Sequence, residues 1–161
     1  MKRRFELLRC LVLVLAFCLI PHAFAAEDVR SQVVVGSDFP STREALVEAI
    51  EAEGLVVSAV VPFNGMLART AGDLARAASP FANAEIVQFC SAALAWQLLE
   101  EEAVQIALCP LAISVFTTAA EPDRVVLAYR SPGQATAGRV KAENLLRRLV
   151  QRSAELARLR W

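Results

Sequence analysis

The chain has 161 residues, and its 17 basic side chains balance its 17 acidic side chains. Such a balance lacks the surplus of positive charge that a general nucleic-acid binder needs, so we expect no nucleic acid as a partner. The length is that of one ordinary domain plus a short extension, with enough residues to bury a hydrophobic core.

The first 25 residues have the three parts of a secretory signal peptide. Residues 2–4 are basic, an apolar run extends from Leu11 to Ile20, and Ala23-Phe24-Ala25 has the small residues of a cleavage site. The apolar run is shorter than the about 20 residues of a membrane-spanning helix. We therefore expect secretion, with the periplasm as the destination. The alternatives are a retained membrane anchor and a lipoprotein signal that ends at Cys18.

Cleavage after Ala25 would change the chemistry that is open to the chain. It would remove His22, which is the only histidine, together with Cys10 and Cys18. It would also leave a small excess of acids, because the leader holds four basic residues and one acidic residue. A chain without histidine has neither a Ser-His-Asp nor a Cys-His site. The sequence therefore favours a non-enzymatic domain without a metal or cofactor.

The first part of the mature chain predicts a strand, a helix and a second strand. Residues 26–31 have the composition of a leader, and Gln32–Gly36 is a short β-branched run. Ser41-Thr42-Arg43-Glu44 forms a capping box for a helix that ends at Gly54. Leu55–Val61 is rich in valine and predicts a strand.

The middle of the chain predicts a weak helix, a strand and a further helix. The weak helix lies around Leu67–Ala77, and the strand is Glu85–Phe89. Ser91 can cap a helix over Ala92–Glu101. Its expected apolar members are Leu94, Trp96 and Leu98. The acidic run Glu100–Glu102 is expected to be a solvated face.

The last part of the chain predicts three strands and a long helix. Val104–Leu108 and Leu111–Thr117 are apolar β-rich runs with a kink at Cys109-Pro110 between them. Arg124–Arg130 is the return strand of a hairpin, and Gly138–Leu159 is an amphipathic helix. Strands and helices do not alternate regularly along the chain. This order favours an α+β fold with a mainly antiparallel sheet and two or three helices packed on one face.

Cys90 and Cys109 are the candidate residues for thiol chemistry. In an oxidising compartment they could form a disulfide, which would close a loop of about 20 residues and stabilise the fold by roughly 3 kcal/mol. Two buried free thiols, or a redox or metal site, are the alternatives. A redox pair usually has Cys-X-X-Cys spacing, and a structural zinc site usually has four ligands.

The C-terminal helix carries more basic than acidic residues. Its apolar stripe is expected to pack on the sheet, with the arginine side chains extending around it. The alternative is contact with an anionic membrane surface or an acidic partner. The candidate residues for such a surface are Arg147, Arg148, Arg152 and Arg158.

Five short motifs follow one another in a characteristic order between Glu85 and Pro132. They are Ile86–Ser91 with its Phe-Cys pair, Leu98-Leu99, Ala107–Pro110, Ile113–Phe116 and Val125–Tyr129. Together with the helix and strand upstream, they resemble the domain-of-unknown-function 302 family. The resemblance implies an α+β domain similar to the TATA-box-binding-protein-like folds, and a dimer. It implies no activity.

These observations predict the organisation and the function of the chain. The expected parts are a signal peptide (1–25), a leader (26–31), the α+β domain (32–133) and a C-terminal helix packed on or extending it (134–161). We expect a non-enzymatic domain that binds a small ligand or a protein, as a possible homodimer. The alternatives are a thiol-redox protein that uses Cys90 and Cys109, and a peripheral membrane protein that docks through its basic helix.

Overall fold

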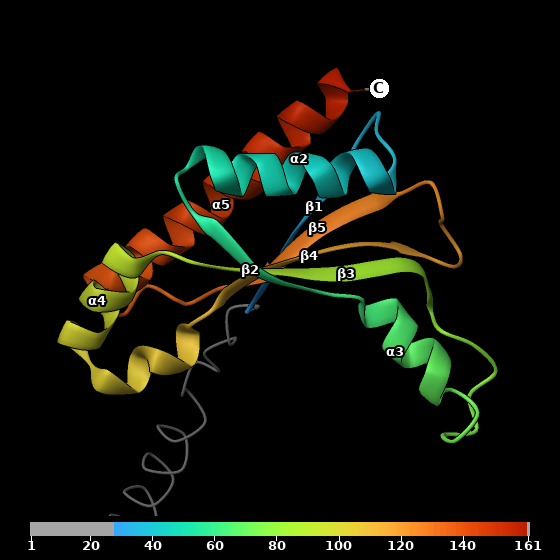
Figure 1. The fold of residues 1–161 in the computed structure, drawn as a ribbon, viewed down its shortest axis with the longest axis horizontal. Coiled ribbons are helices and arrows are strands. Elements are labelled where there is room, and N and C mark those ends of the chain that lie inside the picture. Colours follow the sequence, from blue (N-terminus) through green and yellow to red (C-terminus); the bar gives the residue numbers. More distant parts are fainter. Residues whose placement is uncertain (1–27, 161) are drawn as a thin grey trace, which may run out of the picture.

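The computed structural model describes residues 28–160, so the expected signal peptide lies outside the described residues. Five strands form one antiparallel sheet in the order β1-β5-β4-β3-β2 (Figure 1). The strands are β1 (Val29–Val34), β2 (Val56–Val61), β3 (Phe81–Cys90), β4 (Leu111–Thr118) and β5 (Val125–Arg130). The helices are α2 (Phe39–Ala52), α3 (Phe63–Thr70), α4 (Ala92–Glu101), the 3-10 helix η1 (Ala103–Leu108) and α5 (Ala137–Leu159). The expected α+β class is confirmed.

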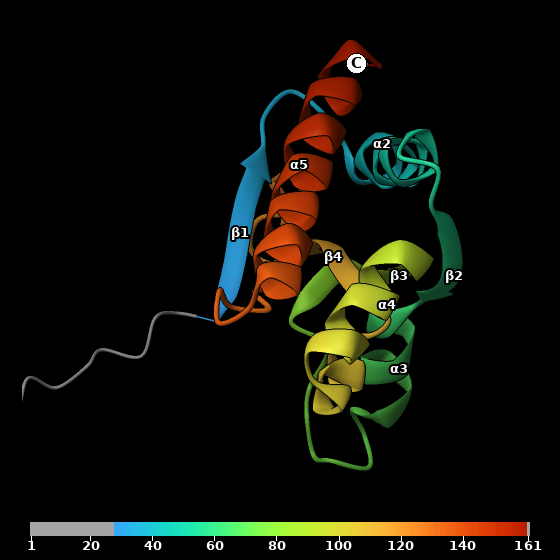
Figure 2. The same ribbon diagram turned by 90° about the vertical axis from the view of Figure 1, so that its left-hand side faces the viewer.

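The two longest helices cover one face of the sheet. α2 and α5 lie side by side above it, whereas α3 lies on the opposite side (Figures 1 and 2). Alternate residues of β4 are buried, and Ile113 and Val115 join the same core as Leu46 of α2 and Leu149 of α5. This alternation is what a strand with one covered face requires. Within residues 28–160, no helix is long and apolar enough to cross a membrane.

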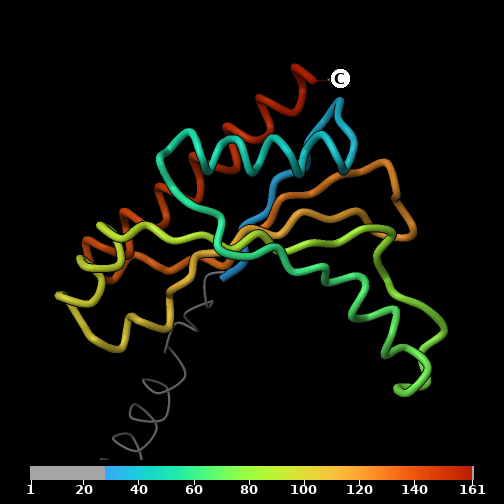
Figure 3. The backbone as a smooth tube through the Cα atoms, in the orientation of Figure 1, coloured from blue at the N-terminus to red at the C-terminus, as the bar shows by residue number. Residues whose placement is uncertain are grey.

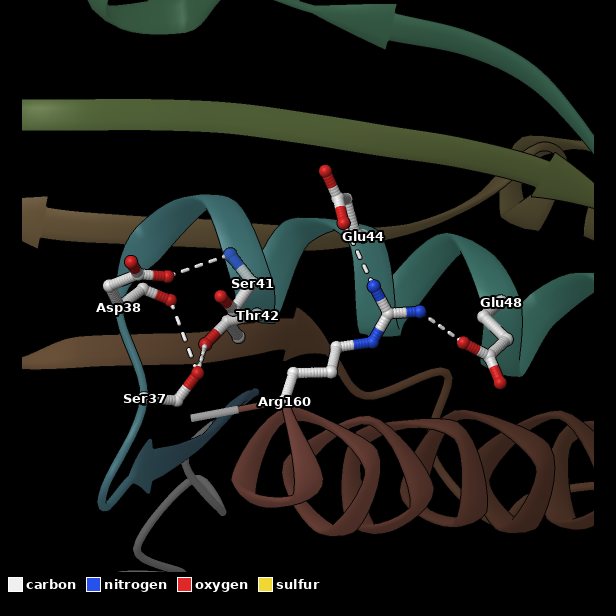
Figure 4. Close-up of polar contacts among 7 residues, drawn as sticks. All are labelled: Ser37, Asp38, Ser41, Thr42, Glu44, Glu48 and Arg160. Carbon is white, nitrogen blue, oxygen red and sulfur yellow. Dashed lines mark hydrogen bonds and ion pairs between the residues drawn. The ribbon is translucent and has the colours of Figure 1, made fainter.

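The first strand and the first helix both begin earlier than predicted. β1 begins at Val29, inside the stretch that was expected to be a leader. α2 is capped by Asp38 rather than Ser41, because Asp38 Oδ1 accepts a hydrogen bond from Ser41 N at 2.8 Å (Figure 4). Pro40 then lies in the first turn, a position that suits proline because no intrahelical donor is needed there. Glu44 instead forms an ion pair with Arg160 (Figure 4).

The predicted strand Val104–Leu108 is wrong, because this segment forms the 3-10 helix η1. Val104 and Ile106 are exposed, while the side chain of Gln105 is buried and donates to Leu98 O at 3.1 Å. The apolar pattern was misleading because the one polar residue in it is the one that the fold buries. Figure 3 shows the backbone leaving the sheet after β3, passing through α4 and η1, and returning to β4.

Two further expectations about helices need correction. The helix after β2 spans Phe63–Thr70, earlier than the expected Leu67–Ala77. It is anchored by aromatic contacts, since the Phe81 ring meets the rings of Phe63 and Phe116 edge to face at 6.4 and 5.4 Å between centroids. Trp96 was expected to share the apolar side of α4 with Leu94 and Leu98, but it is 69% exposed whereas both leucines are buried.

Candidate functional site

The second face of the sheet is only partly covered, and it contains a hollow. Ser114 of β4 lies on this face, between its register partners Ile86 of β3 and Ala128 of β5. All three side chains are half-buried. The hollow has a volume of about 400 Å³, and Pro110 and Ala112 line it as well. A surface of small and apolar side chains in the middle of a sheet suits apolar contacts with a ligand or a protein.

Three elements border this face. α3 lies beyond one end of it, held there by the edge-to-face contact between Phe63 of α3 and Phe81 of β3. At the other end, Ala107 and Leu108 of η1 and Val29 of β1 line the hollow. Arg130 is the only charged residue among those that line the hollow.

The end of the hollow next to β1 is held by a polar cluster around Glu143. Tyr129 Oη donates to Glu143 Oε1 at 2.9 Å, and Ser131 Oγ donates to Glu143 Oε2 at 2.6 Å. Ser131 N donates to Asp28 O at 2.6 Å, which fixes the start of β1 beside the hollow. Burial, together with the hydrogen bond to Glu143, raises the pKa of Tyr129 to about 12. The phenol therefore stays protonated and acts as a hydrogen-bond donor to the carboxylate.

The two cysteines lie at the same end of neighbouring strands. Cys90 ends β3 and is exposed, whereas Cys109 precedes β4, is half-buried and forms a cis peptide bond with Pro110. Both are free thiols in the structure. Burial raises the pKa of the Cys109 thiol, and the nearby Cys90 raises it further. The expected disulfide stays a prediction. In the described part of the chain, no group of three His, Cys, Asp or Glu side chains is arranged to hold a metal ion.

The four candidate arginines on α5 are exposed, and two of them lie next to carboxylates. Arg148 Nη2 lies 3.5 Å from Glu53 Oε2, and Arg152 Nη1 lies 3.7 Å from Glu155 Oε2. Arg147 Nη2 donates to Asn144 Oδ1 at 2.9 Å. Arg158 is exposed near the end of the same helix. These carboxylates offset part of the positive charge, and docking of this helix on an anionic surface stays a prediction.

Comparison with known proteins identifies the family. The family model described as "Domain of unknown function DUF302" matches residues 31–158. The chain belongs to the DUF302 family. The solved structure of an uncharacterized conserved DUF302 protein from Bacillus stearothermophilus is similar to this chain, with 17% sequence identity and a TM-score of 0.64. The match covers 80% of this chain and 99% of that one, and at this identity it shows the fold alone. No curated protein matches the chain.

Sequence reasoning missed a polar network in this DUF302 domain, which connects α4 and η1 to the start of α5. Glu101 was expected to be solvated, but its Oε1 and Oε2 accept hydrogen bonds from Gly138 N at 2.8 and 3.1 Å. The pKa of Glu101 lies below its ordinary value, mainly because its carboxylate is hydrogen-bonded to the Thr136 side chain. Partial desolvation acts in the opposite direction, and weaker hydrogen bonds from Gln97, Gly138 and Gln105 lower the pKa further. A carboxylate at a helix N-terminus is stabilised by the exposed amides and the helix dipole.

The remaining members of the network explain why Gln105 is buried. Arg139 Nε donates to Gln105 Oε1 at 2.9 Å, and Arg139 Nη1 donates to Pro132 O at 3.1 Å. Thr136 caps α5 by accepting from Arg139 N at 3.3 Å. Thr136 is a residue type that often caps helices, and it was the only local sign of this network in the sequence. Glu101, the acid that completes the network, lies on another helix and is distant in the sequence.

Proposed function

We propose that this DUF302 domain is a non-enzymatic binding domain whose partner is a second copy of the chain. The observation that carries the proposal is the partly covered face of the sheet, with its small and apolar side chains around Ser114 and Ala128. A contiguous apolar patch on a protein surface is a feature of interaction sites.

The size of the face supports a protein partner. The spacing of neighbouring strands and the rise per residue give each face of a five-stranded sheet with strands of about six residues an area of roughly 500 Å². A stable interface buries about 800 Å² on each partner, so the face and its borders in α3 and η1 supply most of what a dimer needs. A two-fold axis through the face would bring the same apolar patch of each copy together, as in most homodimers.

The test is to place a charge on this face and to measure the association state by sedimentation velocity. Ala128→Glu puts a carboxylate beside Ser114, and Ser31→Arg puts a cation at a position that is already exposed and opposite Ala128 in the register. We expect both variants to sediment as monomers while the unmodified chain sediments as a dimer. The matched control is Ala120→Glu, the same change in the exposed turn between β4 and β5, which should leave the dimer intact.

The Ser31→Arg variant keeps the test decisive if Ala128→Glu fails to fold. Its circular dichroism should match that of the unmodified protein, because the Ser31 side chain is exposed in the single chain. A dimer that survives both substitutions in folded protein would show that the partner does not bind here.

Thiol chemistry is the second candidate function, and the exposed position of Cys90 beside Cys109 favours it. In a redox protein the pair would exchange reversibly between two thiols and a disulfide. Mass spectrometry with and without glutathione tests this candidate. A bond that forms in oxidised glutathione and opens in reduced glutathione supports it, whereas a bond that reduced glutathione leaves intact makes the pair a structural link.

A further inference from the structure

A second cavity lies on the helical side of the domain, where α4 and α5 meet near the end of α2. Its volume is about 390 Å³, and it shares no lining residue with the hollow on the sheet. The cavity is open to solvent, and its apolar surface comes from half-buried Leu55 and from the small exposed edges of Leu94 and Leu145. Its volume lies in the range of small-molecule sites.

Two cationic side chains of α5 line the same cavity. Lys141, Leu145 and Arg148 recur at helical spacing, so they lie on one side of the helix. The rise of the helix separates the backbones of Lys141 and Arg148 by about 10 Å. Between them, Leu145 gives the cavity an apolar surface next to each charge.

The two cations differ in their partners. Arg148 Nη2 has the carboxylate of Glu53 at 3.5 Å. Lys141 Nζ donates to the neutral Gln97 Oε1 at 2.7 Å, and no ion pair within residues 28–160 involves Lys141. The cavity therefore has one ammonium group without a carboxylate partner at one end.

We propose that this cavity binds a small amphiphilic carboxylate, with its anionic head at Lys141 and its hydrocarbon chain along Leu145 and Leu94. A carboxylate would give the ammonium group a charge-assisted hydrogen bond. The hydrocarbon chain would bury its surface against the leucine side chains. A single uncompensated cation beside apolar side chains matches one negative charge on an apolar body better than it matches a strongly hydrated polyanion.

Calorimetric titration with octanoate tests the proposal, with octanol and butyrate as comparison ligands. Octanoate should bind saturably. Octanol has the same chain without the charge, and butyrate has the charge on a much shorter chain, so both should bind at least roughly tenfold more weakly. If octanol binds as tightly as octanoate, the charged head is not recognised as proposed. If butyrate binds as tightly as octanoate, the hydrocarbon tail is not recognised. Either result would overturn the proposal.

Substitutions at Lys141 test whether octanoate binds in this cavity. Lys141→Gln should weaken octanoate binding roughly tenfold or more, and Lys141→Arg should keep most of it. The matched control is Arg158→Gln, which removes an equal charge from the same helix outside the cavity and should leave the affinity unchanged. The proposal is overturned if octanoate does not bind at millimolar concentration, or if Lys141→Gln and Arg158→Gln bind it equally well. The sheet face plays no part in this site, so failure of the dimer proposal leaves this test intact.

Discussion

Single residues in this domain often have roles that depend on a neighbour distant in the sequence. Gly138 is an example, since a Cβ atom there would lie 2.7 Å from Glu101 Oε2 and 3.0 Å from Leu98 Cδ2. A larger side chain at this position would therefore require the side chains of Glu101 and Leu98 to shift. The carboxylate that fills the space of the missing side chain is also the acceptor for the Gly138 amide.

Gly138→Ala should destabilise the fold by about 1–2 kcal/mol, because the Glu101 carboxylate would have to move away from the backbone amide that donates a hydrogen bond to it. Urea unfolding measures this loss. Gly72→Ala is the matched control, since nothing lies within 4 Å of a Cβ atom at Gly72. Equal stability of the Gly138→Ala variant and the control would mean that the contact between α4 and α5 is looser than described.

Tyr129 gives a spectroscopic test, because it is the only tyrosine of the chain. Its pKa of about 12 in the folded protein lies above its ordinary value of 10.0. The folded state therefore favours the protonated phenol, and this contribution to stability is complete below pH 10.0 and is lost as the pH rises toward about 12.

Ultraviolet absorbance of the phenolate should show a titration midpoint close to 12 in the folded protein and close to 10.0 in urea. In Glu143→Gln, which removes the charge of the acceptor, the folded midpoint should shift downward. A folded midpoint near 10.0 in the unmodified protein would contradict the placement of Tyr129 against Glu143.

At the scale of elements, helix ends were harder to predict than helix bodies. The sequence contains two acceptable caps for α2, Asp38 and Ser41, and local rules favour the capping box at Ser41. Which cap forms depends on where β1 ends and on the position of Pro40. The body of α2 and the end at Gly54, where φ is +72°, agree with the prediction because periodicity and glycine conformation are local properties.

The two caps can be distinguished by substitution. Asp38→Ala should lower the melting temperature clearly, because Ser41 N would lose its acceptor, whereas Ser41→Ala should change it little. Thermal unfolding followed by circular dichroism gives both values. The opposite order would restore the capping box as the start of the helix.

The end of α5 is held against α2 by charge. Arg160 Nη1 lies 2.8 Å from Glu44 Oε2, and Arg160 Nη2 forms an ion pair with Glu48. Both pairs are largely exposed, so Arg160→Ala should cost at most about 1 kcal/mol, and less at high salt. Urea unfolding at low and high salt measures this cost, with Arg158→Ala as the control on the same helix. A loss that does not depend on salt would point to packing rather than charge.

The candidate sites were less predictable than the fold for physical reasons. The sequence correctly predicted α4 from the Ser91 cap, but periodicity could not show that Trp96 faces solvent. That depends on which side of α4 meets α5. Likewise, the Glu101 network and the cavity at Lys141 join segments that become neighbours only in the folded chain.

At the scale of the whole molecule, the arrangement is asymmetric. Two long helices cover one face of the sheet, and α3 lies toward one end of the other face (Figures 1 and 2). The proposed dimer and the proposed carboxylate site use opposite sides of the domain. Both proposals describe a protein that recognises partners through shape and burial, without catalytic side chains.

Light scattering on the unmodified protein over a range of dilutions tests the central claim most directly. The account predicts a mass of twice the chain at high concentration, with dissociation only on strong dilution, because the open face of each copy covers that of the other. A mass of one chain at every concentration would contradict it.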